Sequence, residues 1–131
     1  MPLNNDLKQR IQNTYSQWLS ENQFKPRRSQ REMIAAIARL IGNIESDAEG
    51  VRVPDDNPHL LLIEAGTGTG KTVAYLLPSI ILAQSLNKKL VIATATINLQ
   101  EQLIHKDLPD LMKSAGLTFS YALAKGRGRY V

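Results

Sequence analysis

The sequence predicts an α/β fold in which helices flank a parallel sheet, and three observations support this fold class. Apolar runs at 60–63 and 90–95 have the composition of buried strands. A helix-forming run at 70–85 lies between them, where a crossover helix would connect two parallel strands. The joining segment 64–70 is rich in glycine, as a tight turn between a strand and a helix requires. We therefore expect a right-handed βαβ unit.

A helix is predicted at the N-terminus, within residues 1–23. Asn5 or Asp6 can cap it. The apolar residues that recur at helical spacing, and should face the core, are Leu7, Ile11, Tyr15, Trp18 and Leu19. The tripeptide Phe24-Lys25-Pro26 then interrupts the helical pattern, so a second unit is expected to span residues 24–131.

A second helix should begin at a capping box formed by Ser29 and Glu32, because each side chain can satisfy a free backbone N–H of the first turn. Gly42 is expected to end this helix. The sequence from 43 to 58 is polar and acidic and contains two prolines, which predicts an exposed loop.

Three elements are predicted after the crossover helix: helices over 97–104 and 108–114, and a strand over 118–122. Pro78 lies inside the crossover helix and should bend or break it, because proline lacks a backbone N–H. Asp107 can cap the last helix, and Pro109 suits its first turn.

Residues 64–72 have the sequence of a phosphate-binding loop. Three glycines within five positions let successive backbone N–H groups point inward, and the helix that follows adds the positive end of its dipole. Lys71 would reach the β and γ phosphates and the Thr72 hydroxyl would ligate magnesium, so these two are the candidate catalytic residues. The residues expected to contact ATP here are Ala65, Gly66, Thr67, Gly68, Thr69, Gly70, Lys71 and Thr72. Ala65 departs from the general pattern, which has glycine at that position.

Two other segments carry candidate binding residues. Gln30 lies at the start of the second helix near Arg27, and its amide can donate to and accept from an adenine edge at once. A glutamine taken alone is more often a polar surface residue. Thr94, Thr96 and Gln100 follow the second predicted strand, where hydroxyl, amide and helix N–H groups can hold a nucleic-acid backbone.

Composition and charge limit the function classes. The 131 residues suffice for one domain or part of one and carry a net charge of +4. Basic residues cluster at 25–31 and 125–129, which indicates a polyanionic partner, with solvated surface charge as the alternative. Arg127 and Arg129 would line a DNA strand path together with Thr96 and Gln100.

Cysteine is absent, which excludes disulfides and thiolate metal sites within these residues. The sequence shows neither a membrane-length apolar run nor a secretory leader, so we expect no membrane contact and a cytoplasmic location.

Four segments resemble, in order and spacing, the DinG-type helicases of the XPD-like iron–sulfur branch of superfamily 2. The residues that look like that family's glutamine motif are Phe24, Pro26, Arg27, Gln30 and Met33. Residues 64–72 are similar to its motif I, in which alanine at position 65 is normal. Residues 90–102 followed by 106–109 look like motif Ia, and residues 124–131 resemble the stretch that leads to the first cysteine of the cluster.

The resemblance implies a P-loop NTPase (RecA-like) fold with an incomplete first motor domain. It implies an ATP-dependent DNA helicase that translocates 5′ to 3′ on single-stranded DNA in repair and replication. Gln30 would then recognise adenine, and Thr94, Thr96 and Gln100 would touch the strand. A 4Fe–4S cluster, an Asp-Glu-Ala-His box and the remaining helicase domains would belong to a longer parent. This chain is expected to be the N-terminal piece of that parent or the product of a truncated gene. The piece itself should bind nucleotide better than it hydrolyses it.

Two other functions are compatible with parts of the sequence. A small phosphate-loop kinase would need a lid and an acceptor site, and nothing resembling either follows Lys71. A non-enzymatic nucleic-acid-binding module would use the basic clusters, bind DNA without nucleotide and tolerate the loss of Lys71.

Overall fold

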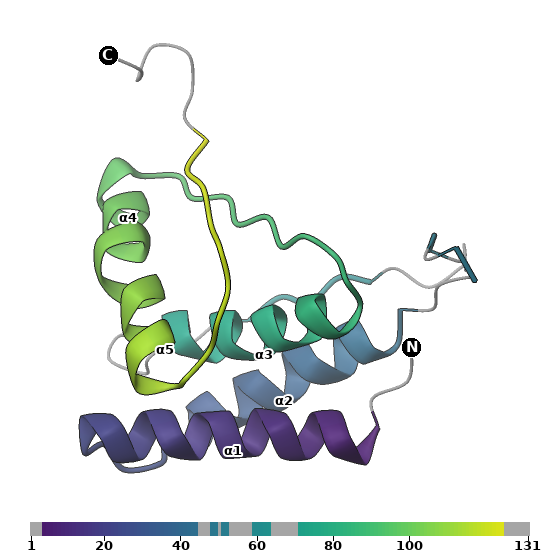
Figure 1. Cartoon of the computed structure of the whole chain (residues 1–131), viewed down its shortest axis with the longest axis horizontal. Coiled ribbons are helices and arrows are strands. Elements are labelled where there is room, and N and C mark those ends of the chain that lie inside the picture. Colours follow the sequence, from purple (N-terminus) through teal and green to yellow (C-terminus); the bar gives the residue numbers. More distant parts are fainter. Residues whose placement is uncertain (1–3, 45–47, 50, 53–58, 64–70, 125–131) are drawn as a thin grey trace.

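The computed structural model describes residues 4–44, 48–49, 51–52, 59–63 and 71–124. The helices within these ranges are α1 (Asn5–Asn22), α2 (Arg28–Gly42), α3 (Lys71–Ser85), α4 (Ile97–Gln102), the π-helix η1 (Leu103–Asp107) and α5 (Leu108–Ser114). Figure 1 shows α1, α2 and α3 packed together, with α4, η1 and α5 following one another as a column beside them.

Helix α3 lies at the centre of the core because its sequence is apolar on nearly every side. Leu76, Leu77 and Ile81 are fully buried, and α3 packs along α2 and contacts α1. A helix that is apolar all round is stable only where other elements cover it. Leu111 of α5 is also fully buried and belongs to the same core. The core therefore holds α3 in place from several sides, which positions its first turn.

Helix α1 confirms the predicted apolar stripe but not the predicted cap. All five stripe residues are buried. The N-cap is Asn4, whose side-chain Oδ1 accepts a hydrogen bond from the Leu7 N–H at 2.8 Å. The expectation that Asn5 or Asp6 caps the helix is therefore wrong, because Asn4 already satisfies a free N–H of the first turn and both residues lie inside the helix.

The capping box predicted for α2 does not form. The helix begins at Arg28 with Arg27 as its N-cap, and no side chain makes a capping hydrogen bond there. Ser29 lies inside the first turn, and the Glu32 carboxylate instead pairs with the Arg28 guanidinium at 2.9 Å. This spacing of four residues brings opposite charges together on an exposed helix face. Gly42 is the last residue of the helix, as predicted.

The helices predicted over 97–104 and 108–114 form one continuous helical stretch instead of two. Asp107 has helical dihedrals and makes no capping hydrogen bond, so its predicted role as an N-cap is wrong. Asp107 is the last residue of η1, so the helical stretch runs through Asp107 and on past Pro109, which leaves no separate helix start for Asp107 to cap. In the wider π-turn the Leu108 N–H donates to the Leu103 carbonyl, and the chain passes the proline without a break. Pro78 likewise leaves α3 unbroken.

The predicted parallel sheet is not confirmed. Apart from an isolated bridge residue at Arg52, the described residues contain no β-strand. The predicted strands that are irregular in the structure are 60–63, 90–95 and 118–122. Leu62 and Val91 are each 86% exposed, whereas strands of a parallel sheet are covered on both faces. An apolar run becomes a strand only when a neighbouring backbone pairs with it, and composition does not specify that neighbour.

Loop 43–58 is largely exposed where the structure describes it, in agreement with the prediction. None of the helices in the described ranges has the length and hydrophobicity that crossing a bilayer requires.

Candidate functional site

The first turn of α3 carries the two residues predicted to act on phosphates. Lys71 is its first residue and is exposed, and Thr72 follows and is half-buried. The first backbone N–H groups of a helix have no partner within it, and the helix dipole places partial positive charge there. The loop residues that precede this turn lie outside the described residues: Ala65, Gly66, Thr67, Gly68, Thr69 and Gly70. The described part of the motif thus sits where a helix can bind an anion.

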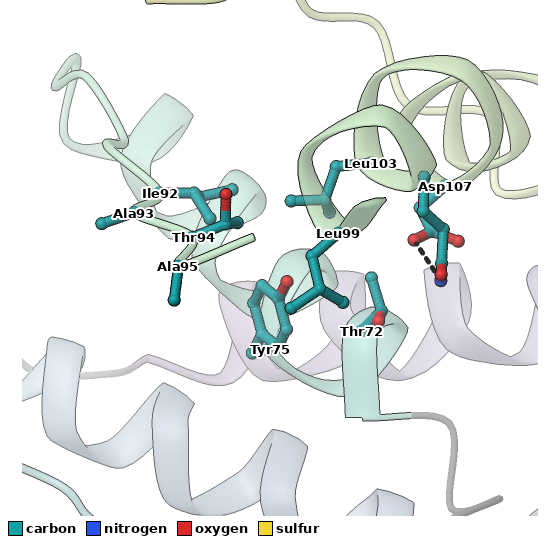
Figure 2. A pocket seen from close by; sticks show the side chains of 10 residues that line it. Thr72, Tyr75, Ile92, Ala93, Thr94, Ala95, Leu99, Leu103 and Asp107 are labelled. Atoms are coloured by element: carbon teal, nitrogen blue, oxygen red, sulfur yellow. Dashed lines mark hydrogen bonds between the residues drawn. The ribbon is translucent and has the colours of Figure 1, made fainter. Parts of the chain in front are cut away.

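A cavity of about 300 Å³ lies beside this turn (Figure 2). The residues that line it are Thr72, Tyr75, Ile92, Ala93, Thr94, Ala95, Leu99, Gln102, Leu103 and Asp107. Figure 2 shows Thr72 and Tyr75 on the α3 side, facing Leu99 of α4, with the segment that precedes α4 forming a further wall. Most of the lining is apolar, and the polar groups are hydroxyls, one amide and one carboxylate. Such a site suits a ligand held by a few oriented polar contacts.

Burial changes the acid–base behaviour of two groups in this cavity. It raises the pKa of the Tyr75 phenol, the negative charge of Asp107 raises it further, and the side-chain hydrogen bond with Thr72 lowers it. Burial also raises the pKa of the Asp107 carboxyl, while the hydrogen bond from Gln102 and the charge of Lys106 lower it. Gln102 Nε2 donates to Asp107 Oδ2 at 3.2 Å, the dashed line in Figure 2. The Tyr75 phenol therefore stays protonated at neutral pH and links to the Thr72 hydroxyl.

The adenine-reading candidates lie apart from the residues that line this cavity. Gln30 is only 3% exposed, and the Tyr15 hydroxyl donates to its Oε1 at 2.5 Å. Gln30 is therefore a buried, hydrogen-bonded residue and not a polar surface residue. Arg27 is exposed at the N-cap of α2, and its backbone N–H donates to the Tyr15 hydroxyl at 3.5 Å.

Three of the candidate nucleic-acid residues lie in or just before the first turn of α4. Thr94 lines the same cavity as Thr72. Thr96 is the N-cap of α4, where its Oγ1 accepts a hydrogen bond from the Leu99 N–H at 3.2 Å, and Gln100 lies half-buried in the first turn of α4. Arg127 and Arg129 lie outside the described residues.

Sequence reasoning missed three residues that shape the two sites: Tyr15, Tyr75 and Asp107. The helical spacing of Tyr15 predicts a core residue, and spacing cannot show that the Tyr15 hydroxyl meets Gln30 of the neighbouring helix. Tyr75 lies three residues after Thr72, so it shares a helix face with Thr72, and this spacing was an available signal. Asp107 is the last residue of the π-helix η1 and lines the cavity, and the helical spacing of the sequence does not indicate a π-helix.

Comparison with known proteins shows the family of the chain. A sequence model of the DEAD/DEAH box helicases matches residues 27–129. The chain belongs to the DEAD/DEAH box helicase family. Membership implies the P-loop NTPase fold class, although the described residues do not form its sheet.

Three bacterial relatives are similar to the chain over a short part of their own length. The ATP-dependent DNA helicase DinG of Photobacterium profundum is 43% identical over 129 residues, which cover 98% of this chain and 17% of the relative. The ATP-dependent DNA helicase YoaA of Haemophilus influenzae is 42% identical over 108 residues, which cover 82% of this chain and 14% of the relative. DinG of Escherichia coli is 42% identical over 108 residues, which cover 82% of this chain and 13% of the relative. The predicted resemblance to DinG-type helicases is thus confirmed, and the chain spans 13% to 17% of the length of these relatives.

Proposed function

We propose that this chain is the ATP-binding part of an ATP-dependent DNA helicase that moves 5′ to 3′ on single-stranded DNA in repair and replication. The observation that carries the proposal is the position of Lys71 and Thr72 in the first turn of the core helix α3, inside the segment that matches the helicase family. The relatives are named as ATP-dependent DNA helicases, which supports the same activity. The remaining helicase domains of the parent would be its partners, and we propose a cytoplasmic location.

The residues present fit magnesium and ATP. The Lys71 side chain is exposed and can reach phosphates at the helix N-terminus, while the half-buried Thr72 hydroxyl can serve as a magnesium ligand. Bound magnesium offsets the charge of the phosphates. The loop from Ala65 to Gly70 would wrap the phosphates with backbone N–H groups, and Gln30 with Arg27 beside it would read the adenine edge.

The residues present do not fit a 4Fe–4S cluster, because the chain contains no cysteine to provide a thiolate ligand. We therefore assign any such cluster to the parent alone. The sequence after Thr72 contains no Asp-Glu-Ala-His box, so the chain lacks the carboxylates that would anchor magnesium and activate water. Binding without rapid hydrolysis is the expected behaviour.

Nucleotide binding is tested by isothermal titration of the chain with magnesium and ATP. Lys71→Ala removes a charge-assisted contact to the phosphates and should weaken binding more than about tenfold, or about 1.4 kcal/mol. Lys89→Ala is the matched control, because Lys89 is an exposed lysine beyond the other end of α3 and should leave the affinity unchanged. Equal affinities for the wild type and the Lys71 variant would remove the phosphate-site assignment.

We propose that single-stranded DNA runs over the start of α4, along Thr94, Thr96 and Gln100 and the basic segment with Arg127 and Arg129. Binding should then weaken with salt at a logarithmic slope near −0.7 for each phosphate neutralised. Replacing both arginines with alanine should flatten this slope, and an unchanged slope would assign them to solvent. DNA binding that ignores both nucleotide and Lys71→Ala would favour the non-enzymatic module instead.

A further inference from the structure

The segment that joins α1 to α2 presents an exposed aromatic ring on a packed base. Helix α1 ends at the left-handed residue Gln23, with φ at 57°, and the Phe24 N–H then donates to the Leu19 carbonyl at 2.9 Å. This helix stop places the Phe24 ring on Trp18, with ring centroids 5.4 Å apart and planes 59° from parallel. Trp18 is only 6% exposed, whereas Phe24 is 56% exposed. One part of the Phe24 ring is therefore packed and the rest faces solvent.

Both ends of this short segment are tied to α1. Phe24 is bonded to the Leu19 carbonyl, and the Arg27 backbone N–H donates to the Tyr15 hydroxyl at 3.5 Å. The Tyr15 ring in turn stacks on Trp18, with ring centroids 6.3 Å apart. A ring that is already held in place loses little conformational entropy when a ligand packs on it. Phe24 is thus the exposed end of a fixed aromatic cluster.

Basic side chains accompany the exposed ring. Four basic and two acidic residues within 21–32 give this segment a net charge of +2: Lys25, Arg27, Arg28, Arg31, Glu21 and Glu32. Glu32 pairs with Arg28 at 2.9 Å. Lys25 and Arg31 are exposed, and neither forms an ion pair with another residue in the part of the chain that the structure describes. A polyanion can therefore contact both cations without breaking an existing pair.

An exposed aromatic ring beside free cations is an arrangement that binds single-stranded nucleic acid. Every nucleobase has a flat face that can stack on a phenyl ring, while the cations contact the backbone phosphates. A duplex already stacks its bases on one another, so it would leave the Phe24 ring unused. An acidic peptide would satisfy Lys25 and Arg31 and would also leave the ring unused. Single-stranded nucleic acid is the ligand class that uses both features.

This surface lies apart from the strand path proposed over the start of α4. Trp18 beneath the ring is bonded to Asp110 of α5, and Figure 1 shows the start of α4 at the other end of the column that α4, η1 and α5 form. We propose that Phe24, Lys25 and Arg31 form a second contact surface for single-stranded nucleic acid, which acts without a bound nucleotide. Either surface can bind if the other does not, so the two proposals can fail separately.

The first experiment measures, by fluorescence anisotropy, how the 131-residue chain binds a labelled oligothymidylate and an abasic oligomer of the same length. Phe24→Leu keeps an apolar contact with Trp18 and removes the stacking face. Binding of oligothymidylate should weaken at least about fivefold, or about 1 kcal/mol, and binding of the abasic oligomer should not change. Equal losses for the two oligomers, or equal affinities for them in the wild-type chain, would overturn the inference.

The second experiment measures the salt dependence of the same binding. Lys25→Ala combined with Arg31→Ala should reduce the logarithmic slope by about 1.4, because each phosphate neutralised contributes about 0.7. Lys8→Ala combined with Lys89→Ala is the matched control, since it removes two exposed charges elsewhere and should leave the slope unchanged. Equal reductions in the two double variants would overturn the inference in favour of general charge attraction. Polyglutamate that displaced oligothymidylate at equal charge concentration would overturn it in favour of an acidic protein partner.

Trp18 reports on this surface without any variant, because it is the only tryptophan and its ring packs on Phe24. Oligothymidylate should change Trp18 emission with the dissociation constant that anisotropy gives, and saturable anisotropy with unmoved emission would overturn the inference. Replacing Arg127 and Arg129 distinguishes the two surfaces. Weaker binding in that variant and not in Phe24→Leu contradicts the second surface alone, whereas the reverse result contradicts the path over α4 and supports the inference.

Discussion

Docking of α1 on α5 depends on the hydrogen bond between Trp18 and Asp110. Trp18 Nε1–H donates to Asp110 Oδ2 at 2.9 Å, and Ser114 Oγ donates to the other carboxylate oxygen at 2.9 Å. A hydrogen bond to a charged group contributes about 1.5–3 kcal/mol, and the half-exposed position of Asp110 places this one at about 1–2 kcal/mol. Trp18→Phe and Asp110→Ala should each lower the free energy of unfolding. The double variant should lose about 1–2 kcal/mol less than the sum of the two.

The cycle is measured by urea unfolding followed by far-ultraviolet circular dichroism, because Trp18 is the only tryptophan and its fluorescence disappears in the variant. Lys113→Ala is the control, since Lys113 is exposed on the same helix α5. Its effect should add to that of Trp18→Phe within about 0.5 kcal/mol. Additive effects of Trp18→Phe and Asp110→Ala would refute the contact as the link between α1 and α5.

Three further variants test the packing and the cavity. Leu76→Ala removes a fully buried side chain at the centre of α3 and should lower the free energy of unfolding by about 2–5 kcal/mol in urea titrations. Asp107→Asn should stabilise the chain at pH 7: burial raises the folded-state pKa of Asp107, so the wild type is destabilised as pH rises through that pKa. The neutral amide can still accept a hydrogen bond from Gln102. The gain in stability should vanish below the ordinary carboxyl pKa of about 3.9, which urea unfolding midpoints at pH 7 and pH 3 would show. Thr96→Ala removes the cap of α4 and should cost about 1 kcal/mol locally, seen as faster amide exchange in its first turn.

The helices were predictable from the sequence because their apolar spacing is a local property. The stripe from Leu7 to Leu19 is buried as expected, and α3 and α5 begin and end close to the predicted positions. Helix starts were less predictable, because several polar side chains near each start could cap it. Asn4 caps α1 in place of its neighbours. The Glu32 carboxylate, which the predicted capping box required, instead forms an ion pair with Arg28.

The sheet and the contacts between distant residues could not be predicted in the same way. A strand depends on a partner elsewhere in the chain, and the exposed Val91 shows an apolar residue without the cover that a sheet would give it. The candidate site was predictable where chemistry lies in consecutive residues, as at Lys71 and Thr72. The Tyr15 hydroxyl on Gln30 joins two helices and appears only once the packing is known.

The central claim is that the first turn of α3 binds the phosphates of a nucleotide, and nuclear magnetic resonance of the ¹⁵N-labelled chain tests it most directly. Titration with magnesium-ATP should shift the backbone amide resonances of Lys71, Thr72 and Val73 in a saturable manner. The amides of Gln84 and Ser85, at the opposite end of the same helix, should stay in place. Saturable shifts confined to other elements, or unmoved resonances at Lys71 and Thr72 in millimolar nucleotide, would contradict the account.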